Sequence, residues 1–227
     1  MSTMCWNCHR AASKSFKRVL KLLIHLNKPN MVVLLEPRIS GIQADIAITS
    51  FGLPFSHRVE AQGLSGGIWV LWNEEWKVEV VRNHRQFIHL HIFDSKMLLI
   101  EFIAIYGHPV ASQRAFLWPE LNSLVSSNSI SWLLGGDFNA LLHPSDRKGG
   151  SLNKLGVCKL FSNWFKANDM HDLGFKGPTF TWSRGSLWER LDRAICNTTW
   201  RLNFPEASIF YLAKIKYDLR PILIRIA

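Results

Sequence analysis

The stretch WLLGGDFNALLHP, residues 132–144, raises the question on which the interpretation of the whole chain depends. It begins with an apolar run that predicts a buried strand, passes through two glycines, and then presents Asp137 and Asn139. Charged side chains are almost never fully buried unless they are paired. One interpretation is a turn, because Gly, Asp and Asn favour turns and Asx side chains cap the local backbone. The other is a functional site.

The length and charge of the chain narrow its class. At 227 residues the chain is one large domain or two small ones, and we expect a single domain over residues 1–227. The net charge of +10, from 27 Lys and Arg against 17 Asp and Glu, suggests a polyanionic partner such as nucleic acid. Residues 1–30 contain basic residues and no acid, although a solvated helix face also explains such a run.

Several classes of protein are not expected. No uncharged apolar stretch of about 18 residues is present, so we expect no membrane span. The first residues lack the pattern of a secretory signal, and four cysteines in such a chain argue against a disulfide scaffold. The chain also lacks a Walker loop, a G-x-G-x-x-G fingerprint, a G-x-S-x-G elbow and an H-E-x-x-H pair.

Two short motifs match patterns whose context is missing. CWNCH at residues 5–9 fits the C-x-x-C-H haem pattern, but haem attachment requires export and zinc would need a second ligand pair. We therefore expect neither haem nor zinc. NTT at Asn197 is formally a glycosylation sequon, and without secretion we expect it to be unused.

The apolar periodicity predicts strands in consecutive runs with helices between them. An amphipathic helix is predicted over residues 11–27, with an apolar face of Phe16, Val19, Leu20, Leu23 and Leu26. Further helices are predicted within 111–127 and around 153–167, the latter with Leu155 and Phe161 toward a core. Strands are predicted at 31–36, 66–73, 77–83, 87–93, 98–107, 132–138, 179–184, 189–197, 208–213 and 221–227, with those from 66 to 107 in a meander-like run. This order favours an α+β or layered α/β domain.

Polar groups stand at the ends of six separate segments. They are Asn7, Glu36, Tyr106, Asp137 with Asn139, Asp192, and Asp218. Each alone is more often a turn or a cap, but they converge if the strands share a direction at one edge. Together, on a basic chain, they fit an oxygen-ligand site for Mg²⁺ or Mn²⁺. Mg²⁺ usually binds one or two protein carboxylates and a substrate phosphate, so we expect Asp137 and Asn139 to meet a phosphate.

A family resemblance rests on eight motifs in order: WNC…AASKSF, VVLLEPRISG, LSGGIWVLWN, AIYGHP, GGDFNALLHPSDRKGG, DLGFKGPTFTWSR, RLDRAICN and FPEA. Together they resemble the endonuclease domain of plant LINE-type non-LTR retrotransposons, within the endonuclease/exonuclease/phosphatase superfamily of apurinic endonucleases and DNase I. The likeness runs from Trp6 to Leu223. It implies an α+β fold, a four-layer α/β/β/α sandwich of two mixed, mostly antiparallel sheets with helices outside. It also implies Mg²⁺-dependent nicking of DNA in the nucleus.

The resemblance implies a role for each site residue. Glu36 would be the main ligand of Mg²⁺ or Mn²⁺, and Asp218 would be the acid of the family's terminal Ser-Asp-His and a second metal ligand. Asn7 and Tyr106 would contact the scissile phosphate.

The remaining roles concern the attacking water and the catalytic histidine of the family. Asp137 would orient or deprotonate the water, and Asn139 would hold Asp137 or a phosphate oxygen. Asp192 would orient the catalytic histidine.

The chain departs from the family at two positions. Leu219 stands where the family has the histidine of Ser-Asp-His, and Arg10 stands where a glycine is expected. Two interpretations stay open: an endonuclease impaired at Leu219, or a degenerate, inactive remnant that retains at most DNA binding. A phosphatase is a weaker third. Having lost its partner, Asp192 is expected to turn toward solvent, Arg193 or Arg220.

Overall fold

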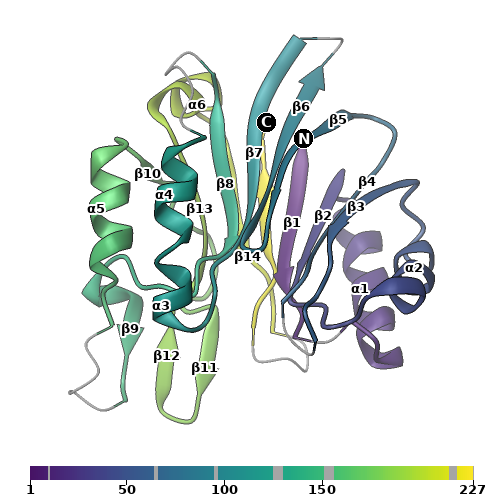
Figure 1. The fold of residues 1–227 in the computed structure, drawn as a ribbon, viewed down its shortest axis with the longest axis horizontal. Coiled ribbons are helices and arrows are strands. Elements are labelled where there is room, and N and C mark those ends of the chain that lie inside the picture. The colour runs from purple at the N-terminus through teal and green to yellow at the C-terminus, as the bar shows by residue number, and fades with distance from the viewer. Residues whose placement is uncertain are drawn as a thin grey trace.

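The computed structural model describes residues 1–9, 11–63, 66–94, 97–124, 130–150, 156–214 and 219–226. Within these ranges, two six-stranded sheets lie face to face with helices on both outer sides (Figure 1). The first sheet has the order β14-β15-β1-β2-β4-β3. Its strands are β1 (Ser2–Asn7), β2 (Met31–Leu35), β3 (Phe55–Val59), β4 (Ile68–Trp72), β14 (Ser208–Tyr211) and β15 (Ile222–Arg225).

The second sheet has the order β10-β13-β8-β7-β6-β5. Its strands are β5 (Lys77–His84), β6 (Phe87–Asp94), β7 (Met97–Tyr106), β8 (Trp132–Asp137), β10 (His171–Asp172) and β13 (Asp192–Cys196). Both sheets are mixed, because β1 and β2 are parallel, as are β7 and β8, while the other pairs are antiparallel. The predicted α+β, four-layer sandwich is confirmed.

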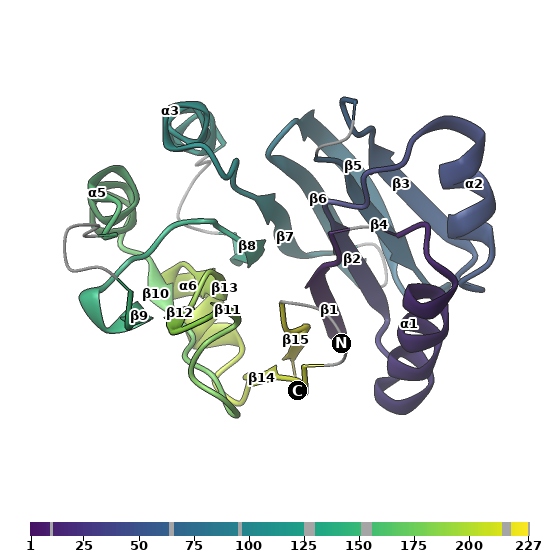
Figure 2. The ribbon, with the colours of Figure 1, turned by 90° about the horizontal axis from the view of Figure 1, so that it is seen from below.

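The helices form the two outer layers (Figures 1 and 2). Those beside the first sheet are α1 (Lys14–Asn27) and α2 (Gly41–Thr49). Those beside the second are α4 (Leu117–Asn122) and α5 (Lys159–Ala167). The remaining elements are α3 (Ala111–Arg114), α6 (Thr198–Asn203), the 3₁₀ helix η1 (Pro144–Asp146), and a small sheet of β9 (Arg147–Lys148), β11 (Trp182–Arg184) and β12 (Leu187–Glu189).

The strand β2 shows why the fold needs four layers. All five of its residues are buried, because apolar neighbours cover both faces of the strand. Val33 and Leu35 belong to the cluster between the two sheets, while Val32 and Leu34 belong to the cluster beneath α1 and α2. A strand that is covered on both faces has a continuous apolar run in its sequence, and β2 has the run MVVLL.

The two glycines before Asp137 have separate structural reasons. A Cβ on Gly135 would lie 2.9 Å from Ile224 Cδ1 of the facing sheet, so a side chain there would hold the sheets apart. Gly136 has a φ of +137°, and a Cβ there would lie 2.2 Å from the carbonyl oxygen of Ile105. The absence of a side chain at both positions allows the end of β8 to pack closely against the facing sheet and against the neighbouring strand β7.

Most predicted elements are present, with differences at particular residues. The helix over 11–27 is α1, capped by Ser13, and Phe16, Leu20 and Leu23 are buried as expected. Leu26 was predicted on the apolar face and is 66% exposed, so that prediction is wrong. The predicted run of strands also divides, because β4 joins the first sheet while β5, β6 and β7 form a meander in the second.

Some elements were not predicted, and some predictions cannot be compared. The strands β1 and β3 and the helices α2 and α6 were missed. Residues 125–127 of one predicted helix and Leu155 of another lie outside the described residues. The Asn197 side chain accepts a hydrogen bond from the Trp200 backbone N–H at 2.9 Å, so the sequon residue is the N-cap of α6.

The cysteines are described in full and form no disulfide with one another. Cys5 packs between the two sheets, whereas Cys8 packs in the cluster beneath α1 and α2, so the two thiols of the CWNCH motif lie in different layers. Across the described residues, no helix is both long and apolar enough to cross a membrane.

Candidate active site

Six of the predicted polar residues meet at one edge of the sandwich: Asn7, Glu36, Tyr106, Asp137, Asn139 and Asp192. Asn7 and Glu36 belong to the first sheet, at the ends of the parallel neighbours β1 and β2. In the second sheet, Tyr106 of β7 pairs with Asp137 of β8, which pairs in turn with Asp192 of β13. The registers of β7, β8 and β13 thus align residues up to 86 positions apart in the chain, from Tyr106 to Asp192.

Asp137 connects the two sheets. Its Oδ2 accepts a hydrogen bond from Asn7 Nδ2 at 2.8 Å and from Asn139 Nδ2 at 3.2 Å, and its Oδ1 accepts one from the Asn139 backbone N–H at 2.7 Å. The carboxylate is 1% exposed. Burial raises the pKa of Asp137 to about 6, to which the charge of Glu36 adds, while the hydrogen bonds from Asn7 and Asn139 oppose the rise. A carboxylate with a pKa near neutrality is suited to accept a proton.

Glu36 is the second buried carboxylate of the site and is paired with two basic side chains. Its Oε2 lies 2.8 Å from His9 Nδ1, and its Oε1 accepts hydrogen bonds from Arg38, with Nε at 3.0 Å. Burial raises the pKa of Glu36, but the hydrogen bonds and charges of His9 and Arg38 outweigh burial and hold that pKa below its ordinary value. Glu36 is therefore ionised at neutral pH.

His9 joins the two carboxylates into one array. Its backbone N–H donates to Asn7 Oδ1 at 3.2 Å, so hydrogen bonds and an ion pair run from Glu36 through His9 and Asn7 to Asp137. Tyr106 donates its hydroxyl to Glu36. Burial, together with the charges of Glu36 and Asp137, raises the pKa of Tyr106, which keeps the hydroxyl protonated as a donor.

Backbone strain is concentrated at the same place. Six non-glycine residues of the described ranges have positive φ, and four of them belong to the site: His9 at 52°, Glu36 at 56°, Arg38 at 56° and Asn139 at 48°. Such conformations cost on the order of 1–3 kcal/mol each and persist only where the surroundings fix them. Their clustering independently indicates a functional site.

Asp192 is buried without full hydrogen bonding. It is 1% exposed and hydrogen-bonds the Thr181 side chain, but its Oδ2 has no partner among the described residues. Burial, and next the charge of Asp137, raises the pKa of Asp192 well above its usual value.

The expectation that Asp192 turns toward solvent, Arg193 or Arg220 is wrong. Arg193 instead donates to Asp146 at 2.9 Å and Asp172 at 3.0 Å. Arg220 donates to the carbonyl oxygens of Phe180 and Leu212. Both guanidinium groups thus have better partners, and Asp192 stays where its strand places it.

Leu219 lies beside this part of the site. Its carbonyl oxygen accepts a hydrogen bond from Trp6 Nε1 at 3.3 Å, and it forms a β-bridge with Trp182. The next residue, Arg220, donates its backbone N–H to the carbonyl of Thr181, whose side chain contacts Asp192. Leu219 is 2% exposed. Asp218, the predicted metal ligand, and Arg10 lie outside the described residues.

Three contributors were not predicted from sequence: His9, Arg38 and Thr181. His9 comes two positions after Asn7 and pairs with Glu36. Arg38 comes two positions after Glu36 in the LLEPR motif. These spacings were the available signal, but a left-handed backbone at His9, Glu36 and Arg38, which brings the side chains together, has no mark in the sequence.

A pocket of about 610 Å³ opens next to Tyr106. Its lining is mixed: the basic residue Arg85, the acids Glu60 and Glu120, the histidines His84 and His108, and apolar residues such as Phe116. The pocket extends the site toward α3, and its exposed Arg85 is a cationic group available to an anionic ligand.

Comparisons with known proteins agree on the fold. The sequence profile of the Endonuclease/Exonuclease/phosphatase family matches residues 4–214. No curated protein matches the chain. Among solved structures, an AP endonuclease from Archaeoglobus fulgidus is 13% identical with a TM-score of 0.74, and the alignment covers 100% of this chain and 99% of that one.

Two further structures have a similar fold. The 3′ phosphatase NExo from Neisseria, bound to a product DNA hairpin, is 15% identical with a TM-score of 0.73, covering 100% of this chain and 99% of that one. The endonuclease domain of TRAS1, a telomere-specific non-LTR retrotransposon, is 15% identical with a TM-score of 0.71, covering 99% and 97%. At these identities the likeness shows the fold, which is the DNase I-like sandwich that the resemblance implied. Because the family profile extends over most of the sequence, the chain belongs to the Endonuclease/Exonuclease/phosphatase family.

Proposed function

We propose that the chain is a divalent-metal-dependent phosphodiesterase that nicks DNA, and that it is impaired at one position. The observation that carries the proposal is the array from Glu36 through His9 and Asn7 to Asp137. It places an ionised carboxylate beside a buried carboxylate whose pKa is about 6. Family membership supports phosphoester chemistry, and the basic charge of the chain supports a nucleic-acid substrate.

The donor set fits Mg²⁺ or Mn²⁺. Glu36 and the side-chain oxygen of Asn7 are hard oxygen ligands, and Asp218 is the proposed second carboxylate. His9 and Arg38 supply the positive charge that keeps Glu36 ionised inside the protein, so a bound cation competes with these two groups for the carboxylate. A bound cation supplies charge neutralisation at the phosphate.

The other residues position the water and the phosphate. Asp137 is proposed to take the proton of the attacking water, since it is held by Asn7 and Asn139 and has a pKa near neutrality. Tyr106, kept protonated, donates to a phosphate oxygen. Water attacks in line with the leaving oxygen, and the phosphodiester bond to that oxygen breaks.

Leu219 is the proposed defect. Its side chain has no donor for the charge that builds on the phosphate, and Asp192 has no imidazole to orient. Loss of one electrostatic donor costs on the order of 10²- to 10³-fold in rate, judging from oxyanion-hole deletions. The buried, partly unpartnered Asp192 also favours the second candidate, an inactive retroelement remnant that retains DNA binding.

The origin and organisation of the chain belong to the same proposal. The fold of the TRAS1 endonuclease domain and the quoted motifs support a LINE-type retrotransposon origin, with DNA in the nucleus as the partner. The profile match over residues 4–214 supports one catalytic domain over residues 1–227.

A plasmid-nicking assay tests the proposal. Supercoiled DNA is incubated with the chain as written, with Leu219→His and with Leu219→His/Asp137→Asn, in Mg²⁺, Mn²⁺ or EDTA. We expect weak or absent nicking by the chain as written, metal-dependent nicking by Leu219→His, and none by the double variant. Nicking that persists in EDTA, or that does not require Asp137, would contradict the proposed site.

A further inference from the structure

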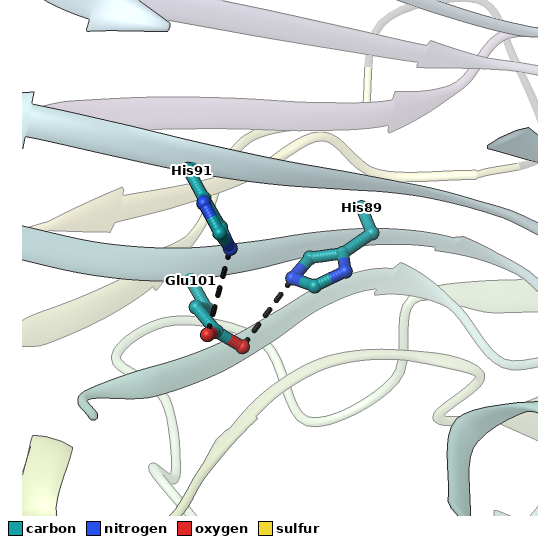
Figure 3. A group of neighbouring side chains, drawn as sticks. All are labelled: His89, His91 and Glu101. Carbon is teal, nitrogen blue, oxygen red and sulfur yellow. Dashed lines mark ion pairs between the residues drawn. The ribbon is translucent and has the colours of Figure 1, made fainter. Parts of the chain in front are cut away.

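A second cluster of chemically active side chains lies on the β6–β7 pair. His91 of β6 is the direct partner of Glu101 of β7, and His89 lies two residues from His91, on the same face of the strand. Figure 3 shows both imidazoles directed at the carboxylate. The intervening Leu90 packs between the two sheets, so the cluster lies on the opposite face of the second sheet, toward the α4 and α5 layer.

The cluster is enclosed and incompletely satisfied. The side chains of His89 and Glu101 are 6% and 5% exposed, while that of His91 is 26% exposed. His89 Nε2 lies 3.3 Å from Glu101 Oε2, and His91 Nε2 lies 3.5 Å from Glu101 Oε1. Neither ring nitrogen of His89 makes a hydrogen bond with the described residues. A buried polar group without a partner needs an explanation, such as an ion.

We propose that His89, His91 and Glu101 form a Zn²⁺ site. One ligand atom from each of the three lies within 4.8 Å of the others. Zinc bonds of about 2.0–2.1 Å in tetrahedral geometry place neighbouring ligand atoms roughly 3.4 Å apart. Each imidazole nitrogen lies at about this distance from a different oxygen of Glu101, so binding requires the two imidazoles to converge on one carboxylate oxygen. Two histidines and one carboxylate are a recognised zinc set, with the fourth position left to water.

The chemistry of this site differs from that at Glu36. Imidazole nitrogens suit zinc and other transition metals, whereas Mg²⁺ prefers oxygen ligands. Glu101 precedes Tyr106 by five residues on β7, a separation of about 17 Å along an extended strand, so one ion cannot serve both places. The partly exposed His91 gives the ion a path from solvent, and the bound ion joins β6 to β7 next to the irregular pairing between Ile92 and Phe93.

This inference departs from the expectation that the chain holds no zinc. That expectation considered the cysteines and the H-E-x-x-H spacing, and neither pattern detects ligands on two paired strands. The competing interpretation is a histidine–glutamate ion-pair cluster that binds no metal.

Zinc titration of the full chain distinguishes the two. The chelator-treated protein is titrated with Zn²⁺ by calorimetry and with Co²⁺ by visible absorption, beside His91→Asn and Glu101→Gln. We expect one equivalent of Zn²⁺ and tetrahedral Co²⁺ bands for the parent. Partners behind metal ligands are worth about 10- to 100-fold in affinity, so loss of a ligand itself should weaken binding by more than about 100-fold.

Two control variants keep the test specific. His25→Asn removes an exposed histidine of α1 and Glu36→Gln alters the other site, so both should bind zinc as the parent does. Thermal unfolding should shift upward with Zn²⁺ in the parent and controls but not in His91→Asn, with circular dichroism showing that each variant is folded. Failure of the parent to bind zinc, or binding that survives both ligand substitutions, overturns the proposal.

Discussion

Asp137 and Asp192 are direct partners across the antiparallel strands β8 and β13, and both carboxyl groups are buried. Two neighbouring buried carboxyl groups repel each other when both are ionised, so burial and the charge of Asp137 together raise the pKa of Asp192. Asp137 has three hydrogen bonds from Asn7 and Asn139, whereas Asp192 has an oxygen without a partner in the described structure. Asp192 is therefore the member of the pair that keeps a proton more readily.

Replacing Asp192 by Asn should stabilise the protein at neutral and higher pH. Because the pKa of Asp192 is raised in the folded state, the parent loses stability as pH rises from the ordinary value of 3.8 through that raised pKa. Asparagine has no charge to bury, so we expect a gain of about 1–3 kcal/mol at alkaline pH that shrinks toward pH 4. Urea unfolding in EDTA across this range measures the difference. A variant less stable than the parent at alkaline pH would show that the carboxylate is satisfied.

Replacing Leu219 by His should restore nicking by on the order of 10²- to 10³-fold. An imidazole at this position supplies a donor next to the Thr181 segment, and the Thr181 side chain hydrogen-bonds Asp192. Leu219→Met is the matched control, because it keeps an apolar side chain and should gain nothing. Initial nicking rates in Mg²⁺ provide the comparison, and equal rates for the two folded variants would refute the assignment of Leu219 as the defect.

Replacing Gly136 by Ala should destabilise the fold far more than replacing Gly174. A Cβ on Gly136 would lie 2.2 Å from the Ile105 carbonyl oxygen, so the backbone of β8 must move, and we expect a loss above about 3 kcal/mol. Gly174 also has positive φ, but no atom lies within 4 Å of its added Cβ. Its loss should be about 1 kcal/mol, the cost of the left-handed conformation alone. Urea unfolding of the Gly136→Ala and Gly174→Ala variants measures the two losses of stability. Similar losses for both variants would show that β8 adapts without strain.

DNA binding in EDTA should weaken steeply between about 50 and 200 mM salt, since neutralised phosphates release counterions. Arg85 is exposed and lines the pocket beside Tyr106, so Arg85→Gln should lower the slope of log affinity against log salt by about 0.9. Lys21 is exposed on α1 in the outer layer, and Lys21→Gln is the control with an unchanged slope. Fluorescence anisotropy with a labelled duplex measures both. Salt-independent affinity, or an equal effect of the two substitutions, would contradict binding at the pocket edge.

The sequence by itself determined the elements whose periodicity is strong. The spacing of Phe16, Leu20 and Leu23 predicted α1, and the apolar run at residues 31–36 predicted the strand β2, because a local pattern follows directly from which faces of the segment are covered. It also showed that Asp137 and Asn139 end a buried strand. Short elements such as β3 and α6 were not predicted, since tertiary contacts rather than a repeating pattern stabilise them.

Only the tertiary structure decided which polar groups meet. Asn7 and Asp137 come from different sheets and are 130 positions apart, so their hydrogen bond depends on how closely the sheets pack at Gly135. The contact of His9 with Glu36 depends on left-handed backbone at both residues, and that of His89 and His91 with Glu101 depends on the register of β6 against β7. A local pattern reports the faces of one segment, whereas register and sheet packing are settled by the sum of contacts with distant segments.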